Sequence, residues 1–148
     1  MLPPGCFMQW LHWHECQAHA AVSRRPAPRA CLFVGDGWRL PTDDEWRQMA
    51  KAYGGVSEDS EEKGKAAYKA LSAGGNSGFN AVLGGSRSED GQYARLEAHG
   101  FYWTASEIDS THGWYYNFGL GGLALHRQNG GEKQRVFSVR CVKNVKTD

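Results

Sequence analysis

Four side chains near the start of the chain are good metal ligands and stand close together. The pattern His-x-His-x-Cys-x-x-His comprises His12, His14, Cys16 and His19, and imidazole and thiolate groups both bind zinc or copper. This spacing does not place the four side chains on one face of a helix, and no partner motif follows them. We therefore predict no metal site and no cofactor.

The sequence contains few residues in patterns that could perform catalysis. It has no Gly-x-Ser-x-Gly nucleophile motif, no phosphate-binding loop and no His-Glu-x-x-His zinc motif. Glu107 and Asp109 are close enough in the chain to form an acid–base pair, but neighbouring carboxylates more often belong to a solvated turn. We predict that the chain has no catalytic residues and is not an enzyme.

Aromatic, amide and basic side chains that could bind a ligand gather on two segments in the C-terminal third. Aromatic rings provide a large contact area at a low entropic cost, and amides adapt their hydrogen bonds to the partner. The alternative is that Tyr115 and Phe118 belong to the core and the rest are ordinary exposed side chains, because alternate strand positions face inward. The residues predicted to bind are Trp114, Tyr116, Asn117, His126, Arg127 and Asn129.

Strands must position these side chains, and the C-terminal third has the alternation typical of strands. In its last stretch, Phe137, Val139 and Cys141 should face the core. They alternate with an outward-facing set: Val136, Ser138 and Arg140. Glycines between the strands indicate tight turns, so an antiparallel meander is expected. The predicted strands cover residues 101–104, 114–118, 123–127 and 136–142, with glycine turns at 119, 121–122 and 130–131.

Residues 37–46 predict the start of a helix. Thr42 is a good N-cap, and Glu45 stands three residues later, which is the spacing of a capping box. Pro41 disfavours an earlier start, and Gly54 can end the helix in the left-handed conformation. Further along the chain, a helix is expected over 63–73, a strand over 79–83 and a hairpin turn at Asp90–Gly91. The elements together predict an α+β fold with two short helices and a glycine-rich antiparallel sheet.

Size and composition exclude several classes of partner. The chain has 148 residues, enough for one domain with a core, and a net charge of +1. It has no basic stripe, so no nucleic-acid partner is predicted. No apolar run approaches the roughly 20 residues of a membrane span, so no transmembrane segment is predicted. Composition leaves the oligomeric state open.

Residues 1–36 differ from the rest and are predicted to be an atypical leader before a domain over 37–145. The first 30 residues hold four of the five prolines and a single acidic residue, Glu15. They lack the basic region followed by an apolar stretch that marks a signal peptide. Two readings stay open for this segment: a disordered leader, or a gene start that was wrongly assigned.

Four motifs in order resemble the Fibrobacter succinogenes major paralogous domain family. The first is Gly-Trp-Arg-Leu-Pro-Thr-Asp-x-Glu-Trp over residues 37–46, and the second is Gly-Phe-Asn-Ala with Gly-Gly-x-Arg over 78–87. The third is Gly-Phe-Tyr-Trp-Thr-Ala-Ser-Glu over 100–107, and the last is Phe-Ser-Val-Arg-Cys-Val over 137–142. The residues assigned to this structural motif set are Trp38, Arg39, Leu40, Pro41, Thr42, Glu45, Trp46, Trp103 and Arg140.

The resemblance implies a fold and a function class. The family is related to the formylglycine-generating (sulfatase-modifying factor) enzymes, which implies a C-type-lectin-like fold. It implies non-catalytic binding of an extracellular glycan or protein ligand by a bacterial surface or secreted protein. In some relatives of this fold, the region before the closing Ser-Val-Arg-Cys strand is diversified by retroelements, which implies a variable receptor as one form of this function.

The cysteines help to distinguish ligand binding from the competing functions. In the family, one Cys precedes the Arg-Leu-Pro motif and another closes the last strand, which implies a disulfide between Cys31 and Cys141; the alternative is two buried thiols. The related oxidases hold copper with a cysteine pair near the C-terminus, where this chain has Cys141 alone. An oxidase of that type and a purely structural surface domain are the competing hypotheses. The calcium-dependent sugar motifs of C-type lectins are missing, so any glycan binding is expected to be calcium-independent.

Overall fold

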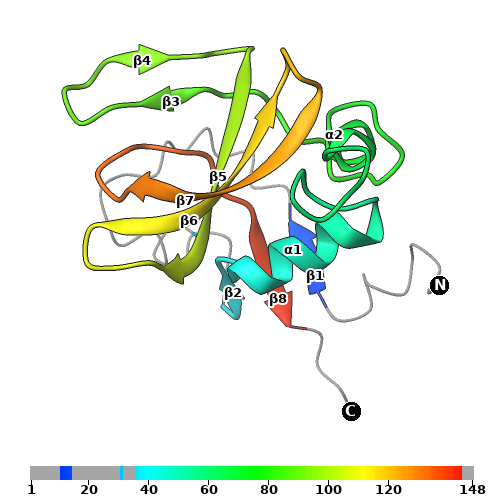
Figure 1. Cartoon of the computed structure of the whole chain (residues 1–148). Helices are drawn as coiled ribbons and strands as arrows, with labels where there is room; N and C mark the ends of the chain where they lie inside the picture. Colours follow the sequence, from blue (N-terminus) through cyan, green and yellow to red (C-terminus); the bar gives the residue numbers. More distant parts are fainter. Residues whose placement is uncertain (1–10, 15–30, 32–35, 145–148) are drawn as a thin grey trace.

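A computed structural model describes residues 11–14, 31 and 36–144 of the chain (Figure 1). The described residues form two helices and small antiparallel sheets, which confirms the predicted α+β class. No helix among them is long and apolar enough to span a membrane. The elements are β1 (Leu11–His14), β2 (Trp38–Arg39), α1 (Asp43–Ala52), α2 (Lys65–Leu71), β3 (Ser86–Arg87), β4 (Tyr93–Ala94), β5 (His99–Glu107), β6 (His112–Gly119), β7 (Ala124–Glu132) and β8 (Cys141–Asn144).

Helix α1 begins where the capping box predicts. The Thr42 hydroxyl accepts a hydrogen bond from the Glu45 N–H, and the Glu45 carboxylate accepts one from the Thr42 N–H at 2.8 Å. The Arg39 guanidinium donates to both oxygens of the same carboxylate at 2.6 and 2.8 Å. Gly54 follows the helix with a φ of +115°, a backbone conformation that glycine adopts without strain. The second helix, α2, lies within the predicted range 63–73.

Strands β5, β6 and β7 form the predicted antiparallel meander. In its register, Tyr102 lies opposite Tyr116, which lies opposite Arg127. Because side chains alternate along a strand, these three residues share one face, while Trp103 and its neighbour Tyr115 share the other. We call these the helix face and the hairpin face, since α1 and α2 contact the strands on one side and the β3–β4 hairpin lies on the other (Figure 1).

The helix face is closed by a core built around one tryptophan. Trp46 of α1 is fully buried and stacks on Tyr116 with ring centroids 4.9 Å apart. Around it pack buried side chains of α1, α2, the meander and the segments that follow the two helices: Met49, Ala50, Val56, Ala67, Tyr68, Leu71, Phe79, Ala81, Tyr102, Phe118 and Leu125. This core fixes the position of both helices against the sheet.

A second core lies on the hairpin face and contains the disulfide. Phe137 packs against Trp103 and Phe101 at centroid distances of 4.4 and 5.0 Å. Cys31 and Cys141 are both fully buried here and are joined by a disulfide, with their Cα atoms 5.6 Å apart. The pairing that the family resemblance implied is therefore confirmed.

A third sheet brings together segments from the two ends of the described chain. Its order is β1–β8–β2, and β8 is antiparallel to both neighbours. Strand β1, Leu11–His14, belongs to the segment that we set apart as a leader over 1–36; the remaining residues of 1–30 lie outside the described residues. Within the described residues, this leader segment therefore contributes a strand to the fold.

The predicted strand over 136–142 is shorter and shifted. Phe137, Val139 and Cys141 are buried as predicted, but regular pairing begins only at β8. The preceding residues run beside β5, where Ser138 accepts a hydrogen bond from Trp103 N–H at 3.1 Å. Arg140 was assigned to an outward position and is instead 5% exposed, because its guanidinium donates to the carbonyls of Phe79 and Asn80 at 2.9 and 2.8 Å.

Two other predicted elements are wrong. Residues 79–83 form no regular strand, since Asn80 has a φ of +53° and Ala81 makes only an isolated bridge to Ser72. Gly130 and Gly131 lie inside β7, not in a turn. A Cβ at Gly131 would lie 2.7 Å from both Trp103 and Tyr115, so this glycine serves close packing on the hairpin face.

Candidate ligand-binding site

The six residues predicted to bind ligand do not form one surface. Trp114, Tyr116 and Arg127 lie on the helix face, whereas Asn117 and His126 point from alternate positions of the same strands. A bulge between Gly113 and Tyr115 changes the register there. Sequence alternation predicted some separation of this kind, but the strand pairing decides which residues meet.

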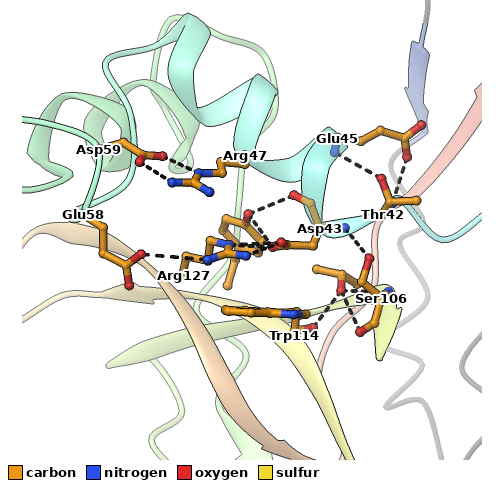
Figure 2. Close-up of polar contacts among 11 residues, drawn as sticks. Thr42, Asp43, Glu45, Arg47, Glu58, Asp59, Ser106, Trp114 and Arg127 are labelled. Carbon is orange, nitrogen blue, oxygen red and sulfur yellow. Dashed lines mark hydrogen bonds and ion pairs between the residues drawn. The ribbon is translucent and has the colours of Figure 1, made fainter. Parts of the chain in front are cut away.

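On the helix face, Arg127 of β7 is bound to Asp43, the first residue of α1 (Figure 2). The guanidinium Nε lies 2.9 Å from Oδ1 and Nη2 lies 2.5 Å from Oδ2. Hydrogen bonding to Asp43 raises the pKa of Arg127 above its ordinary value. This two-point contact is the strong form of an arginine–carboxylate pair, and it ties α1 to β7.

Tyr116 belongs to the same network and is a core residue. Its hydroxyl donates to the Asp43 carbonyl and carboxylate at 3.0 and 2.9 Å, and its ring is 0% exposed. Burial raises the pKa of the phenol, and the neighbouring Asp43 charge acts in the same direction. The prediction that Tyr116 contacts a ligand is corrected: the side chain has no exposed surface because Trp46 covers it.

Trp114 covers this ion pair from the solvent side. The Arg127 guanidinium carbon lies 3.6 Å from the centre of the indole ring, so one ring face is occupied by Arg127 (Figure 2). Glu58 approaches the same guanidinium at 3.9 Å. Since Gly113 pairs with Gly131 and Tyr115 with Gln128, the exposed Asn129 lies in the bulge opposite Trp114. Trp114 and Asn129 are thus the accessible part of the predicted surface.

The other two predicted residues have partners within the chain. The Asn117 side-chain oxygen lies 2.9 Å from His99 Nδ1. His126 Nδ1 lies 2.9 Å from the Ser57 hydroxyl, in the loop that also bonds to β7 through its backbone. Both side chains are half-buried. These contacts hold strands and a loop together and leave the two residues less able to bind a ligand.

The motif residues of the α1 entrance also join segments of the fold. Pro41 accepts a hydrogen bond from Ala105 N–H at 2.8 Å, and Asp43 N–H donates to the Ser106 hydroxyl at 2.9 Å. Leu40 and Pro41 are buried. The first and third motifs therefore contact each other directly, and together they form the N-terminal end of α1.

The hairpin face carries a pocket of about 480 Å³. Ser86 pairs with Ala94 across the hairpin, and both line the pocket, while Arg87 and Tyr93 contact each other through a cation–π interaction. The hairpin thus presents one side to the pocket. The residues that line this hairpin pocket are Ser86, Ser88, Gln92, Ala94, Arg95, Phe101, Tyr115, Gly130, Gly131, Arg135 and Phe137.

Aromatic rings form the floor of the hairpin pocket, and arginines lie at its edge. Tyr115 packs on Phe137 with centroids 4.9 Å apart, and Phe101 contacts both rings, at 5.0 Å from Phe137 and 6.0 Å from Tyr115. Burial raises the pKa of the Tyr115 phenol, and the positive charges of Arg135 and Arg95 act in the opposite direction. An apolar floor with a few polar and charged groups is the usual composition of a small-molecule site.

Sequence reasoning missed this pocket. Tyr115 was considered only as a possible core residue, and Arg95 and Arg135 lie outside the strands that were predicted. One signal was available: the alternation that places Trp114 and Tyr116 on one face requires Tyr115 to face the other. The identity of its neighbours there depended on the hairpin, whose position relative to β5 no local pattern encodes.

The carboxylates considered for catalysis lie at a turn. Asp109 accepts hydrogen bonds from the N–H groups of Thr111 and His112 at 2.7 and 2.8 Å, and these bonds lower its pKa. Glu107 lies 3.3 Å from the Lys133 amine. Within the described residues, no three His, Cys, Asp or Glu side chains gather as metal ligands. Cys16 and His19 lie outside those residues, as do the side chains of His12 and His14.

Comparisons with known proteins identify the family. Neither the curated proteins nor the solved structures include a match to the chain. A family model described as the Fibrobacter succinogenes major domain matches residues 20–143, and it begins within the segment that we set apart as a leader. The match covers most of the chain and includes all four motifs, so the protein belongs to the Fibrobacter succinogenes major domain family.

Proposed function

We propose that the chain is a non-catalytic ligand-binding module of a bacterial surface or secreted protein, built on a C-type-lectin-like form of its α+β fold. The observation that carries this proposal is the hairpin pocket. Its volume of about 480 Å³ falls in the range of roughly 300–1,000 Å³ typical of ligand sites. The ligand class expected is an extracellular glycan or a side chain of a protein partner.

The buried disulfide supports an extracellular location. Cys31 and Cys141 are joined in the interior of the hairpin-face core. Disulfides persist in oxidising compartments and are rare in reducing ones. The disulfide also weakens the oxidase alternative, since Cys141 is bonded to Cys31 and offers no thiolate to bind copper.

The accessible part of the predicted surface is a second candidate site within this function. Trp114 and Asn129 lie together at the bulge between β6 and β7. Asn129 is exposed, so substitutions there are expected to leave the fold intact, as a variable receptor requires. Trp114 is less free to vary because it stacks on Arg127.

A glycan and mucin array probed with the full chain, with and without EDTA, tests the proposal. Three variants are compared with the unchanged chain. Ala94→Trp fills the hairpin pocket from β4. Tyr93→Trp is the control: it places an indole one residue earlier, on the side of the strand that does not line the pocket. Trp114→Ala removes the indole of the second candidate site.

Binding that survives EDTA and is lost in Ala94→Trp, but not in Tyr93→Trp, supports the hairpin pocket as the site. If binding is lost only in Trp114→Ala, the binding site lies at the bulge between β6 and β7. A blank array with a protein whose circular dichroism shows a folded chain would contradict glycan binding and favour a protein partner or a purely structural domain.

A further inference from the structure

We propose that the hairpin pocket takes a ring-shaped ligand that carries one carboxylate, the chemistry shared by a sugar acid and an aromatic acid. This inference rests on the proposed function, because it names the ligand class of the same site. It places the ligand ring against Tyr115, above the buried Phe101 and Phe137, and the carboxylate at Arg95 and Arg135.

The charges of the pocket point to an anion. Among the described residues that line it, two are arginines and none is Asp or Glu. Among the described residues, the one carboxylate within ion-pair distance of either arginine is that of Glu132, whose oxygen lies 3.6 Å from Arg135 Nε; it is 55% exposed and does not line the pocket. Arginine binds carboxylates through paired N–H groups in a fixed plane, so each of the two arginines that line the pocket is a suitable partner for a ligand carboxylate.

The half-buried Tyr115 ring is the aromatic surface that the pocket offers to a ligand ring. Phe101 and Phe137 are 6% and 3% exposed; they stack on each other at an interplanar angle of 20°, His99 stacks on Phe101, and Tyr115 packs against Phe137 at 48°. Such rings bury a large apolar area at a low entropic cost. The Tyr115 hydroxyl, Ser86, Ser88 and Gln92 supply hydrogen-bonding groups around the floor, which is the mixture that a hydroxylated ring requires.

The backbone of Arg95 is held in an unusual conformation beside the pocket. Its φ is +62°, a region that non-glycine residues rarely occupy. The Arg95 carbonyl accepts hydrogen bonds from the N–H groups of Ala98 and His99 at 3.1 and 3.0 Å. Gly85 allows the chain to approach, because a Cβ there would overlap the backbone of residues 94–96. The left-handed backbone and the close approach of Gly85 together set the direction in which the Arg95 Cα–Cβ bond leaves the chain.

Calorimetric titration of the full, oxidised chain tests the inference with matched pairs of ligands. Methyl glucuronide is compared with methyl glucoside, which has the same ring without the carboxylate, and benzoate is compared with benzyl alcohol. Arg95→Gln and Arg135→Gln remove one pocket charge each. Lys69→Gln removes one charge from the exposed side of α2 and serves as the control.

We expect at least one acid to bind about tenfold or more tightly than its neutral partner, since hydrogen bonds to charged groups are the stronger kind. Each arginine variant should weaken the acid about tenfold, and Lys69→Gln should not. The sugar pair and the aromatic pair then distinguish the two sources of the carboxylate. Binding of the acid should also weaken with added salt.

Equal binding of acid and neutral partner, or unchanged binding in both arginine variants, would overturn the inference. If the neutral partner binds and Ala94→Trp abolishes that binding, the proposed function stands and only the carboxylate is wrong. If none of the four ligands binds while the array identifies a ligand of another class, the prediction of a carboxylate on the ligand is again wrong. If the array is blank as well, the inference fails together with glycan binding, and of the proposed function only the binding of a protein partner is left.

Discussion

Both faces of the β5–β6–β7 meander carry aromatic residues and arginines, but one face is closed by helices and the other has an open pocket. On the helix face, aromatic rings are covered by α1 and α2, and the one buried carboxylate, Asp43, is bound by Arg127 and Tyr116. On the hairpin face, Phe101 and Phe137 are also buried, but the half-buried Tyr115 ring lines an open pocket together with two arginines. Aromatic content alone therefore does not identify a binding surface; what covers the rings does.

The comparison also separates two uses of arginine. Arg127 is 14% exposed and its hydrogen bonds are used within the protein. Arg95 is exposed, and among the described residues no carboxylate lies within ion-pair distance of it. An arginine held by an internal carboxylate stabilises the fold, whereas one directed to solvent beside an apolar floor can bind a ligand. Four changes test this division.

Removing the central ring of the helix face should have the largest effect. Trp46→Ala deletes a fully buried side chain, and we expect a loss of about 3–5 kcal/mol in the free energy of unfolding. Ala94→Trp at the open hairpin pocket should change it by less than about 0.5 kcal/mol. Urea unfolding measures both. Similar losses for the two variants would contradict the division into a stabilising face and a binding face.

Removing the disulfide should come next. The bond spans a sequence separation of 110 residues, for which the chain-entropy account gives a stabilisation of about 4–5 kcal/mol, and measured losses range from about 2 to 5. We expect the Cys31→Ser, Cys141→Ser double variant to lose an amount in this range. Reducing agent should destabilise the unchanged chain and leave the variant unaffected; an equal response of both proteins would show that the bond is not the cause.

Breaking the ion pair on the helix face should have an intermediate effect. Arg127→Met leaves Asp43, which is 8% exposed, without its two-point partner, and we expect a loss of about 2–3 kcal/mol. Arg47→Met breaks a similar pair with Asp59, but the Arg47 side chain is 34% exposed, so about 0–1 kcal/mol is expected. Thermal unfolding of the two variants measures the losses of stability. A larger loss for Arg47→Met than for Arg127→Met would contradict the expectation that the more buried ion pair contributes more.

The α1 capping box should give the smallest effect and a dependence on pH. Burial raises the pKa of Glu45, but hydrogen bonds from Arg39 and Thr42 outweigh it and hold the pKa below its ordinary value. The charged form is therefore favoured by folding. Its contribution is complete above the unfolded pKa of about 4.3 and is lost as the pH falls through the folded value.

Glu45→Gln keeps the shape of the capping box and removes the charge. We expect a loss of about 0.5–1 kcal/mol at pH 7. The difference from the unchanged chain should shrink as the pH falls through the lowered pKa of folded Glu45, below which the residue is protonated in both states of the original protein. Denaturant titrations at several pH values measure this difference, and a constant gap across the range would contradict the role of the Glu45 charge.

The sequence allowed the local elements to be predicted, because their signals lie within a few residues. Thr42 and Glu45 define the start of α1, and glycines mark the turn between β6 and β7. The pairing of Cys31 with Cys141 came from family resemblance, since the two residues are far apart in the chain. Local signals failed where a residue distant in sequence determines the backbone conformation. Residues 79–80 form no strand, and their carbonyls accept hydrogen bonds from Arg140, 60 residues away.

The candidate site was predicted less well, for the same reason. Arg127 looked like a surface residue because its partner, Asp43, lies 84 positions earlier. The bulge after Gly113 moves Asn129 beside Trp114 and leaves Tyr115 on the hairpin pocket. The pocket itself is formed by the hairpin, all three strands of the meander and the segment around Arg135. No periodic pattern in the sequence could predict that five such segments meet.

The order of strands in the β1–β8–β2 sheet limits when this protein can fold as a ribosome makes it. The middle strand, β8, is the last in the chain, and both of its neighbours precede it by roughly a hundred residues or more. Until residues 141–144 emerge, β1 and β2 have no partner in this sheet, and the Cys31 thiol waits for Cys141. Contacts so distant in sequence are made slowly. Biosynthesis thus leaves one sheet and one cysteine exposed to wrong partners until residues 141–144 have been made.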